Sequence, residues 1–173
     1  METIIVSVVS MALIIISTLV VTVSTFQSAN KMADAWKSME ERSSVVRQTI
    51  IRVSTPNSYQ GGLINLTVKN EGNANLGDLP RWDAIIQHQS GNACYLEYSD
   101  TYPPGPGEWA VEGIFIAVGT PEVFDLNILN PGEQMTVAIN PSQELGIGET
   151  ARVMLSTPNG VTTQGYITRT EEN

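Results

Sequence analysis

The sequence predicts an α+β protein in which one long apolar helix precedes an antiparallel β-sandwich of the immunoglobulin-like kind. Residues 3–30 contain no charged side chain, which is typical of a helix surrounded by lipid or by other apolar helices. From residue 49 onward, short runs rich in Val, Ile and Thr are separated by Gly, Pro and Asn. We therefore expect an assembly or transmembrane helix over residues 1–48 and an outer sandwich over residues 49–173.

The run from Ile4 to Phe26 contains 23 residues, of which fifteen have large apolar side chains. As a helix it would be roughly 35 Å long, enough to cross the hydrocarbon core of a bilayer. Exposing all of these side chains to water would cost on the order of 22 to 45 kcal/mol. The run must therefore have an apolar partner. Its hydroxyl residues suit packing between helices as well as an ordinary membrane span: Ser7, Ser10, Ser17, Thr18, Thr22, Ser24 and Thr25.

Three interpretations of this run compete. A cleavable secretory signal fits poorly, because the run lacks a basic leader and a small-residue cleavage site. For a permanent anchor, Glu2 is the only charge before the run, and four basic residues follow it, so the positive-inside rule would place the sandwich in the cytoplasm. In the third interpretation a basic leader has been removed, and the helix waits in the membrane before it joins a bundle of identical helices.

Apolar residues continue at helical spacing beyond the run, at Ala29, Met32, Ala33, Trp36 and Met39. Charged residues lie between them, so the helix is predicted to become amphipathic and to end near Arg47. This pattern is typical of a filament subunit and equally of a juxtamembrane stalk. The residues that we expect to make the assembly contacts are Ile4, Ile5, Val8, Val9, Leu13, Ile15, Leu19, Val20, Phe26, Met32, Trp36 and Met39.

Nine short segments have the composition and alternation of strands. The clearest places Ile64, Leu66 and Val68 on one face of a strand and polar residues on the other. Asn-Pro-Gly-Glu at 130–133 is typical of a turn. The predicted strands are Thr49–Ser54, Leu63–Lys69, Trp82–Gln89, Cys94–Tyr98, Trp109–Ala117, Val123–Asn127, Gln134–Ile139, Thr150–Ser156 and Gly160–Arg169.

With the uncharged helix before them, the segments LTVKNEGN, LNPGEQMTVAI and VMLSTPNGV make the chain resemble an archaellin, the archaeal flagellin of the type IV pilin superfamily. Met1 and Ile5 stand where bacterial type IV pilins have Phe and Glu, and a C-terminal cysteine pair is missing. The resemblance implies an extracellular homopolymer, the archaellum filament, whose membrane-embedded precursor is processed by a prepilin-type peptidase and assembled by an ATPase for motility. Glu2 either pairs with an N-terminal amine or stays at the membrane surface.

Proteins with other roles share this combination of a helix and a sandwich. Archaellar stator proteins combine a similar helix with a similar sandwich, and they are the main alternative. A single-span, membrane-anchored extracellular sandwich protein and an adhesive type IV-like pilus subunit are further alternatives. The long amphipathic continuation of the helix and the absence of a basic cytoplasmic flank favour a filament subunit over a stator.

Little in the sequence suggests chemistry. The chain has one Cys (Cys94), one His (His88) and a net charge of −9. We expect no enzyme activity, metal or cofactor, and no nucleic-acid partner, because an acidic chain repels phosphate. Asn65-Leu66-Thr67 is the single N-glycosylation motif, and alternation places Asn65 on the face opposite Ile64. Asn65 is therefore the candidate glycosylation site.

Overall fold

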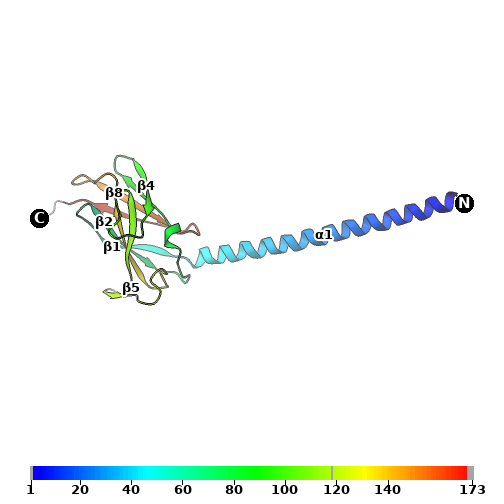
Figure 1. Cartoon of the computed structure of the whole chain (residues 1–173), viewed down its shortest axis with the longest axis horizontal. Coiled ribbons are helices and arrows are strands. Elements are labelled where there is room, and N and C mark those ends of the chain that lie inside the picture. Colours follow the sequence, from blue (N-terminus) through cyan, green and yellow to red (C-terminus); the bar gives the residue numbers. More distant parts are fainter. Residues whose placement is uncertain (1, 118, 171–173) are drawn as a thin grey trace. The chain divides into compact units, whose positions relative to one another are not determined.

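The computed structural model describes residues 2–117 and 119–170. The chain divides into two compact units, one that ends at Ser43 and one that begins at Ser44. The first unit consists of helix, and the second contains the strands, as the ribbon shows (Figure 1).

Helix α1 runs without a break from Glu2 to Gln48, so the predicted continuation to about Arg47 is confirmed. It has neither Gly nor Pro, the two residues that most disfavour a helix interior. Its C-terminal end is capped from outside the helix. The Gln48 carbonyl oxygen accepts the backbone N–H groups of Asn73 and Ala74 at 2.8 and 3.3 Å, and the Thr49 hydroxyl donates to the Val45 carbonyl oxygen at 2.9 Å.

In the described part of the chain, nine strands follow the helix and pair in the order β1-β2-β7-β5-β4-β3-β8-β9, with β6 beside β5. All of these pairs are antiparallel except β4 with β5, where Glu97 and Tyr98 lie opposite Glu108 and Trp109. The strands are β1 (Ile51–Gln60), β2 (Leu63–Asn70), β3 (Asp83–His88), β4 (Ala93–Tyr98), β5 (Glu108–Ala117), β6 (Thr120–Pro121), β7 (Gln134–Asn140), β8 (Thr150–Ser156) and β9 (Thr162–Thr168).

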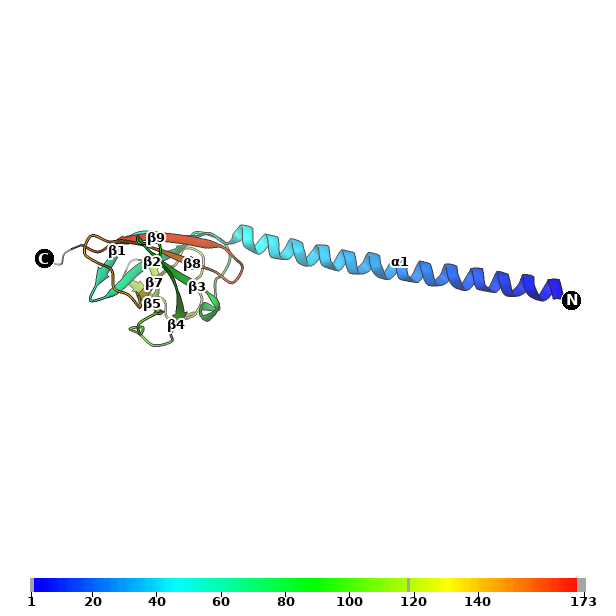
Figure 2. The same ribbon diagram turned by 90° about the horizontal axis from the view of Figure 1, so that it is seen from above.

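The strands form two layers that together approach a closed barrel. One layer contains β1, β2, β7 and β5, and the other contains β4, β3, β8 and β9. At the far edges, β9 lies beside β1 (Figure 2), and the Val53 N–H donates to the Thr163 hydroxyl at 3.3 Å. The predicted α+β class, with a long helix before a mainly antiparallel sandwich, is confirmed.

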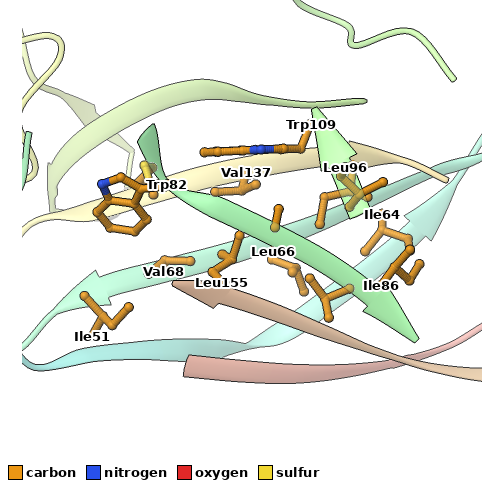
Figure 3. Packing of buried hydrophobic residues seen from close by; sticks show 14 of the residues in the cluster. Ile51, Ile64, Leu66, Val68, Trp82, Ile86, Leu96, Trp109, Val137 and Leu155 are labelled. Carbon is orange, nitrogen blue, oxygen red and sulfur yellow. The ribbon is translucent and has the colours of Figure 1, made fainter. Parts of the chain in front are cut away.

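The inward side chains of both layers form one hydrophobic core (Figure 3). Ile64, Leu66 and Val68 are buried, as their alternation on β2 predicts. Trp109 is buried among residues of both layers and meets Tyr98 edge to face, with ring centroids 4.9 Å apart. Figure 3 places Trp82 at one end of this core and Leu96 and Ile86 toward the other.

One predicted strand is wrong. Residues Val123–Asn127 form a loop, because the Glu122 carboxylate accepts the N–H groups of Val123, Phe124 and Asp125 that a sheet ladder would use. The other boundaries move by up to two residues, except that β1 continues to Gln60 through a register shift between Ser54 and Ser58. A three-residue 3₁₀ turn, Leu79–Arg81, precedes β3.

Candidate assembly surfaces

All twelve residues predicted to make assembly contacts lie on α1 and are exposed in the single chain. Their exposed fractions run from 53% for Val9 to 68% for Ile4 and Phe26. The exposure continues along the helix, where every described side chain from Thr3 to Ser43 is exposed. An apolar surface of this size is stable only in contact with lipid or with other protein.

Four of the seven hydroxyl groups in the apolar run donate hydrogen bonds within the helix. Ser10, Thr18, Thr22 and Thr25 each donate to the carbonyl oxygen four residues earlier, at 2.8 Å in all four cases. Polar groups that are bonded internally need nothing from an apolar environment. The predicted return of these hydroxyls to the backbone is therefore confirmed at these positions, and it removes a cost of burying this surface.

Thr3–Gln48 is long and apolar enough to cross a membrane, by length and composition, and it is the one helix of this kind in the part of the chain that the structure describes. Its composition is uneven. The apolar stretch ends near Phe26, and all four basic and three of the four acidic residues of positions 1–48 lie between 31 and 47. Met32, Trp36 and Met39 lie among these charges and are exposed as well. The helix thus offers a fully apolar first half and a mixed second half.

Asn65 lies on the outer face of β2, opposite the buried Ile64 and Leu66, as the alternation predicts. The residue is half-buried, and its Oδ1 atom is buried without a hydrogen-bond partner among the described residues. Thr67, which completes the motif, is half-buried two residues farther along the same face. Glycosylation at Asn65 stays a prediction.

His88 and Cys94 do not form a nucleophile and base. His88 is buried, and its Nδ1 atom lies 3.2 Å from Glu149 Oε1. Cys94 lies opposite Ile86 on the neighbouring strand and packs against the core. The Gly146 N–H, bonded at 2.8 Å, and then His88 hold the pKa of the Glu149 carboxyl below its ordinary value. The contact between His88 and Glu149 connects the end of β3 to the residue before β8.

The described residues contain no group of three or more His, Cys, Asp or Glu side chains placed to hold a metal ion. The acidic side chains are instead used as local caps. Glu108 Oε2 accepts the Gly105 N–H at 2.8 Å, and Glu133 Oε2 accepts the Asn130 N–H at 2.7 Å. These two bonds fix turns between strands.

The loop after β6 exposes apolar side chains where a strand, Val123–Asn127, was predicted. Phe124 is 87% exposed, and its neighbours Val123 and Leu126 are exposed too. The Phe124 N–H is the largest cause that lowers the pKa of Glu122, and the N–H groups of Asp125 and Val123 and a hydrogen bond with Glu133 add to it. Glu122 is itself buried. A Glu directly before an apolar run was the signal in the sequence, because a carboxylate there caps the following N–H groups.

Charge is distributed unequally along the chain. Positions 1–48 contain four basic and four acidic residues, whereas positions 49–173 contain five basic and fourteen acidic residues. The whole net charge of −9 therefore belongs to the sandwich part. Like charges of this number make the sandwich parts of separate copies repel one another.

The chain matches no protein-family model and no curated protein sequence. Its fold is similar to that of several solved structures. The periplasmic stator protein FlaG of Sulfolobus acidocaldarius matches with a TM-score of 0.53 at 18% identity, over 69% of this chain and 99% of that one. The archaeal flagellum of Methanospirillum hungatei matches with a TM-score of 0.52 at 16% identity, over 94% of this chain and 93% of that one.

The archaeal flagellin FlaB1 of Methanocaldococcus jannaschii matches with a TM-score of 0.50 at 10% identity, over 72% of this chain and 93% of that one. These neighbours are archaellum components. The predicted resemblance is thus confirmed at the level of the fold. Positions 49–173 make up 125 of the 173 residues, so a match over 94% of the chain, as for the M. hungatei filament, includes most of α1.

Proposed function

We propose that this chain is a structural subunit of an archaellum filament that polymerises through its N-terminal helix and serves motility. The observation that carries the proposal is the exposed apolar surface of α1, which runs from Ile4 to Phe26 and contains hydroxyl groups bonded within the helix. Identical helices packed side by side supply the apolar partner that this surface requires. The match to the M. hungatei filament, which extends over most of α1, supports the same role.

In this proposal, residues 1–48 form the filament core and residues 49–173 form the outer domain. The helix moves from lipid into a bundle of identical helices, so one apolar environment replaces another at little cost. The acidic outer domain faces water, and its charge keeps neighbouring filaments apart. The precursor would be stored in the membrane, processed by a prepilin-type peptidase and assembled by an ATPase.

A stator protein is the second candidate function, and the match to FlaG over 99% of that chain favours it. The FlaG match extends over 69% of this chain, which is close to the share of the sandwich alone. In this role α1 would remain in the membrane as a single-span anchor. An adhesive pilus subunit would share the helix-driven assembly and would differ in the ligand of its outer domain.

Shearing filaments from the cell surface and measuring their protein composition by mass spectrometry tests the proposal. We expect this chain to be a main component of the sheared filaments. If it stays in the membrane fraction at low copy number while the filaments are made of another protein, the stator or anchor role replaces the filament role. Loss of swimming without loss of surface attachment, after deletion of the gene, would separate the archaellum from an adhesive pilus.

A further inference from the structure

The outer domain exposes apolar side chains at the loop Val123–Leu126, here called the apolar loop. Phe124 is 87% exposed, Val123 64% and Leu126 62%. Burying a side chain of this kind contributes about 1.5 to 3 kcal/mol. Contact with a second apolar surface would therefore remove three large side chains from water at once.

The apolar loop has a defined conformation. Glu122 Oε1 accepts the N–H groups of Val123, Phe124 and Asp125 at 2.9, 2.7 and 3.4 Å. The loop then closes through a backbone bond of 2.9 Å from the Ile128 N–H to the Asp125 carbonyl oxygen. Because these bonds already order the backbone, little conformational entropy would be lost when Phe124 enters a partner surface.

A hollow on the other layer offers such a surface. It lies on the outer face of β4, β3 and β8, where Ile85 is paired with both Tyr95 and Met154. The hollow has a volume of about 370 Å³ and an apolar floor. Asp83 lies at one end, where its Oδ1 atom accepts the Tyr95 hydroxyl at 3.0 Å.

Arg152 lies beside this hollow, two residues before Met154 on the same face of β8, and it lines the neighbouring hollow together with Gln87 and Tyr166. Its guanidinium donates to Gln87 Oε1, and its Nε atom is buried without a hydrogen-bond partner among the described residues. Three of the five basic side chains after position 48 form ion pairs, namely Arg52, Arg81 and Arg169. Arg152 forms none with the residues that the structure describes, so its charge is available to a carboxylate from outside.

We propose that the apolar loop of one copy docks into the hollow of the next copy, with Phe124 on the apolar floor and the Asp125 carboxylate on Arg152. The two surfaces match in apolar character and in charge. The direction is fixed as well, because Asp83 at the far end of the hollow repels a carboxylate placed there.

The contact is made between copies. The apolar loop follows β6 at the β5 side of the domain, and the hollow lies toward β4 and β8 on the opposite side (Figure 1), so a copy cannot fill its own hollow. A head-to-tail contact of this kind continues from copy to copy as an open filament when the rotation between copies does not close a ring. This inference rests on the proposed function, because a filament aligns the copies and raises their local concentration.

The contact is expected to be weak in isolation. One loop in one hollow buries less than the about 1,200 Å² that a stable interface needs. Copies whose helices are already assembled face each other at an effective concentration in the millimolar range, where a weak contact is occupied. The outer domains would therefore stay separate in solution and associate along the filament.

Cysteine cross-linking in the full-length chain tests the contact. Val123→Cys on the loop and Gln164→Cys, whose position is paired with Met154 beside the hollow, are combined with Cys94→Ala. Oxidation of the filaments is expected to give a ladder of bands at multiples of 18.8 kDa, and each single-cysteine control is expected to give no ladder. Electron microscopy of the same sample records whether filaments are present.

A charge exchange makes the test specific. In the same double-cysteine chain, Asp125→Arg alone or Arg152→Asp alone should lower the yield of the ladder at least tenfold, and the two changes together should restore it. Filaments without a ladder would overturn this inference and leave the proposed function intact. A ladder in membrane material without filaments would support the contact and overturn the filament role. Adducts at masses that are not multiples of this chain would overturn the inference, because the hollow would then hold a different protein.

Discussion

A Cβ atom on Gly72 would lie 2.2 Å from the carbonyl oxygen of Gln48. The loop after β2 therefore fits against the last turn of α1 only because position 72 has no side chain. The same loop supplies the N–H groups of Asn73 and Ala74 that cap the Gln48 carbonyl, and Asn159 donates to the Thr49 hydroxyl at 2.7 Å. The last residues of α1, from Ser44 on, thus belong to the same compact unit as the sandwich.

Replacing Gly72 tests this junction. Gly72→Ala is expected to lower the free energy of unfolding of the sandwich by about 1 to 3 kcal/mol, because backbone atoms must move to admit the methyl group. The matched control is Gly77→Ala, where the nearest heavy atom would lie 3.7 Å from the new Cβ atom. Urea unfolding followed by tryptophan fluorescence measures both. Equal stabilities of the two variants would show that the loop relaxes at no cost.

A charge in the apolar run should prevent assembly. Ile15→Asp places a carboxylate in the proposed bundle of helices. At the centre of a membrane helix, an Asp raises the free energy of insertion by about 2.5 to 3.5 kcal/mol. We expect no filaments from this variant by electron microscopy and normal filaments from the Ile15→Leu control. Filaments at normal yield from Ile15→Asp would contradict the core assignment.

The outer domain should fold without the apolar run. Residues 44–173 retain the whole core and the last turn of α1, so this fragment is expected to be soluble, rich in β structure by circular dichroism, and monomeric at micromolar concentration. Sedimentation velocity measures its mass. If the fragment forms filaments spontaneously, assembly does not depend on the helix.

The stability of the apolar loop should depend on pH through Glu122. Its pKa in the folded chain lies below the ordinary value of 4.5, because N–H groups favour the carboxylate. Glu122 therefore stabilises the fold above about pH 4.5, and this stabilisation is lost as the pH falls through the lowered folded pKa. In urea unfolding at several pH values, Glu122→Gln should be less stable than the unchanged chain at pH 7, and the difference should shrink in acid. Glu112→Gln, at an exposed acid, is the control, and a difference that does not change with pH would exclude this role.

Glycosylation at Asn65 is tested by removing the hydroxyl residue of the motif. If a glycan is present, Thr67→Ala should lower the intact mass of the secreted chain by the mass of that glycan, whereas Thr67→Ser keeps an acceptor motif and the glycan. Mass spectrometry of both variants decides this. An unmodified chain from the native organism would reject the site.

The sequence predicts much of the fold because its patterns follow from local physics. The uncharged run predicts α1, and alternation on β2 predicts the buried faces of Ile64, Leu66 and Val68. The Val123–Asn127 strand was wrong because alternation cannot show that Glu122 occupies the ladder N–H groups. Because of that error, the sequence did not predict that Phe124 is exposed at the surface.

The candidate sites were predicted less completely. The apolar face of α1 could be read from composition, since no tertiary packing within the chain covers it. The hollow near Arg152 could not, because it depends on the register that brings Ile85 beside both Tyr95 and Met154. Register between strands distant in sequence is set by the whole fold.

Electron cryomicroscopy of the native filaments tests whether α1 forms the filament core. We predict that a helical reconstruction has the apolar half of α1, from Ile4 to Phe26, packed against copies of itself along the axis, with the sandwich outside. A filament whose axis is formed by sandwich domains, or by another protein with this chain at its base, would contradict it.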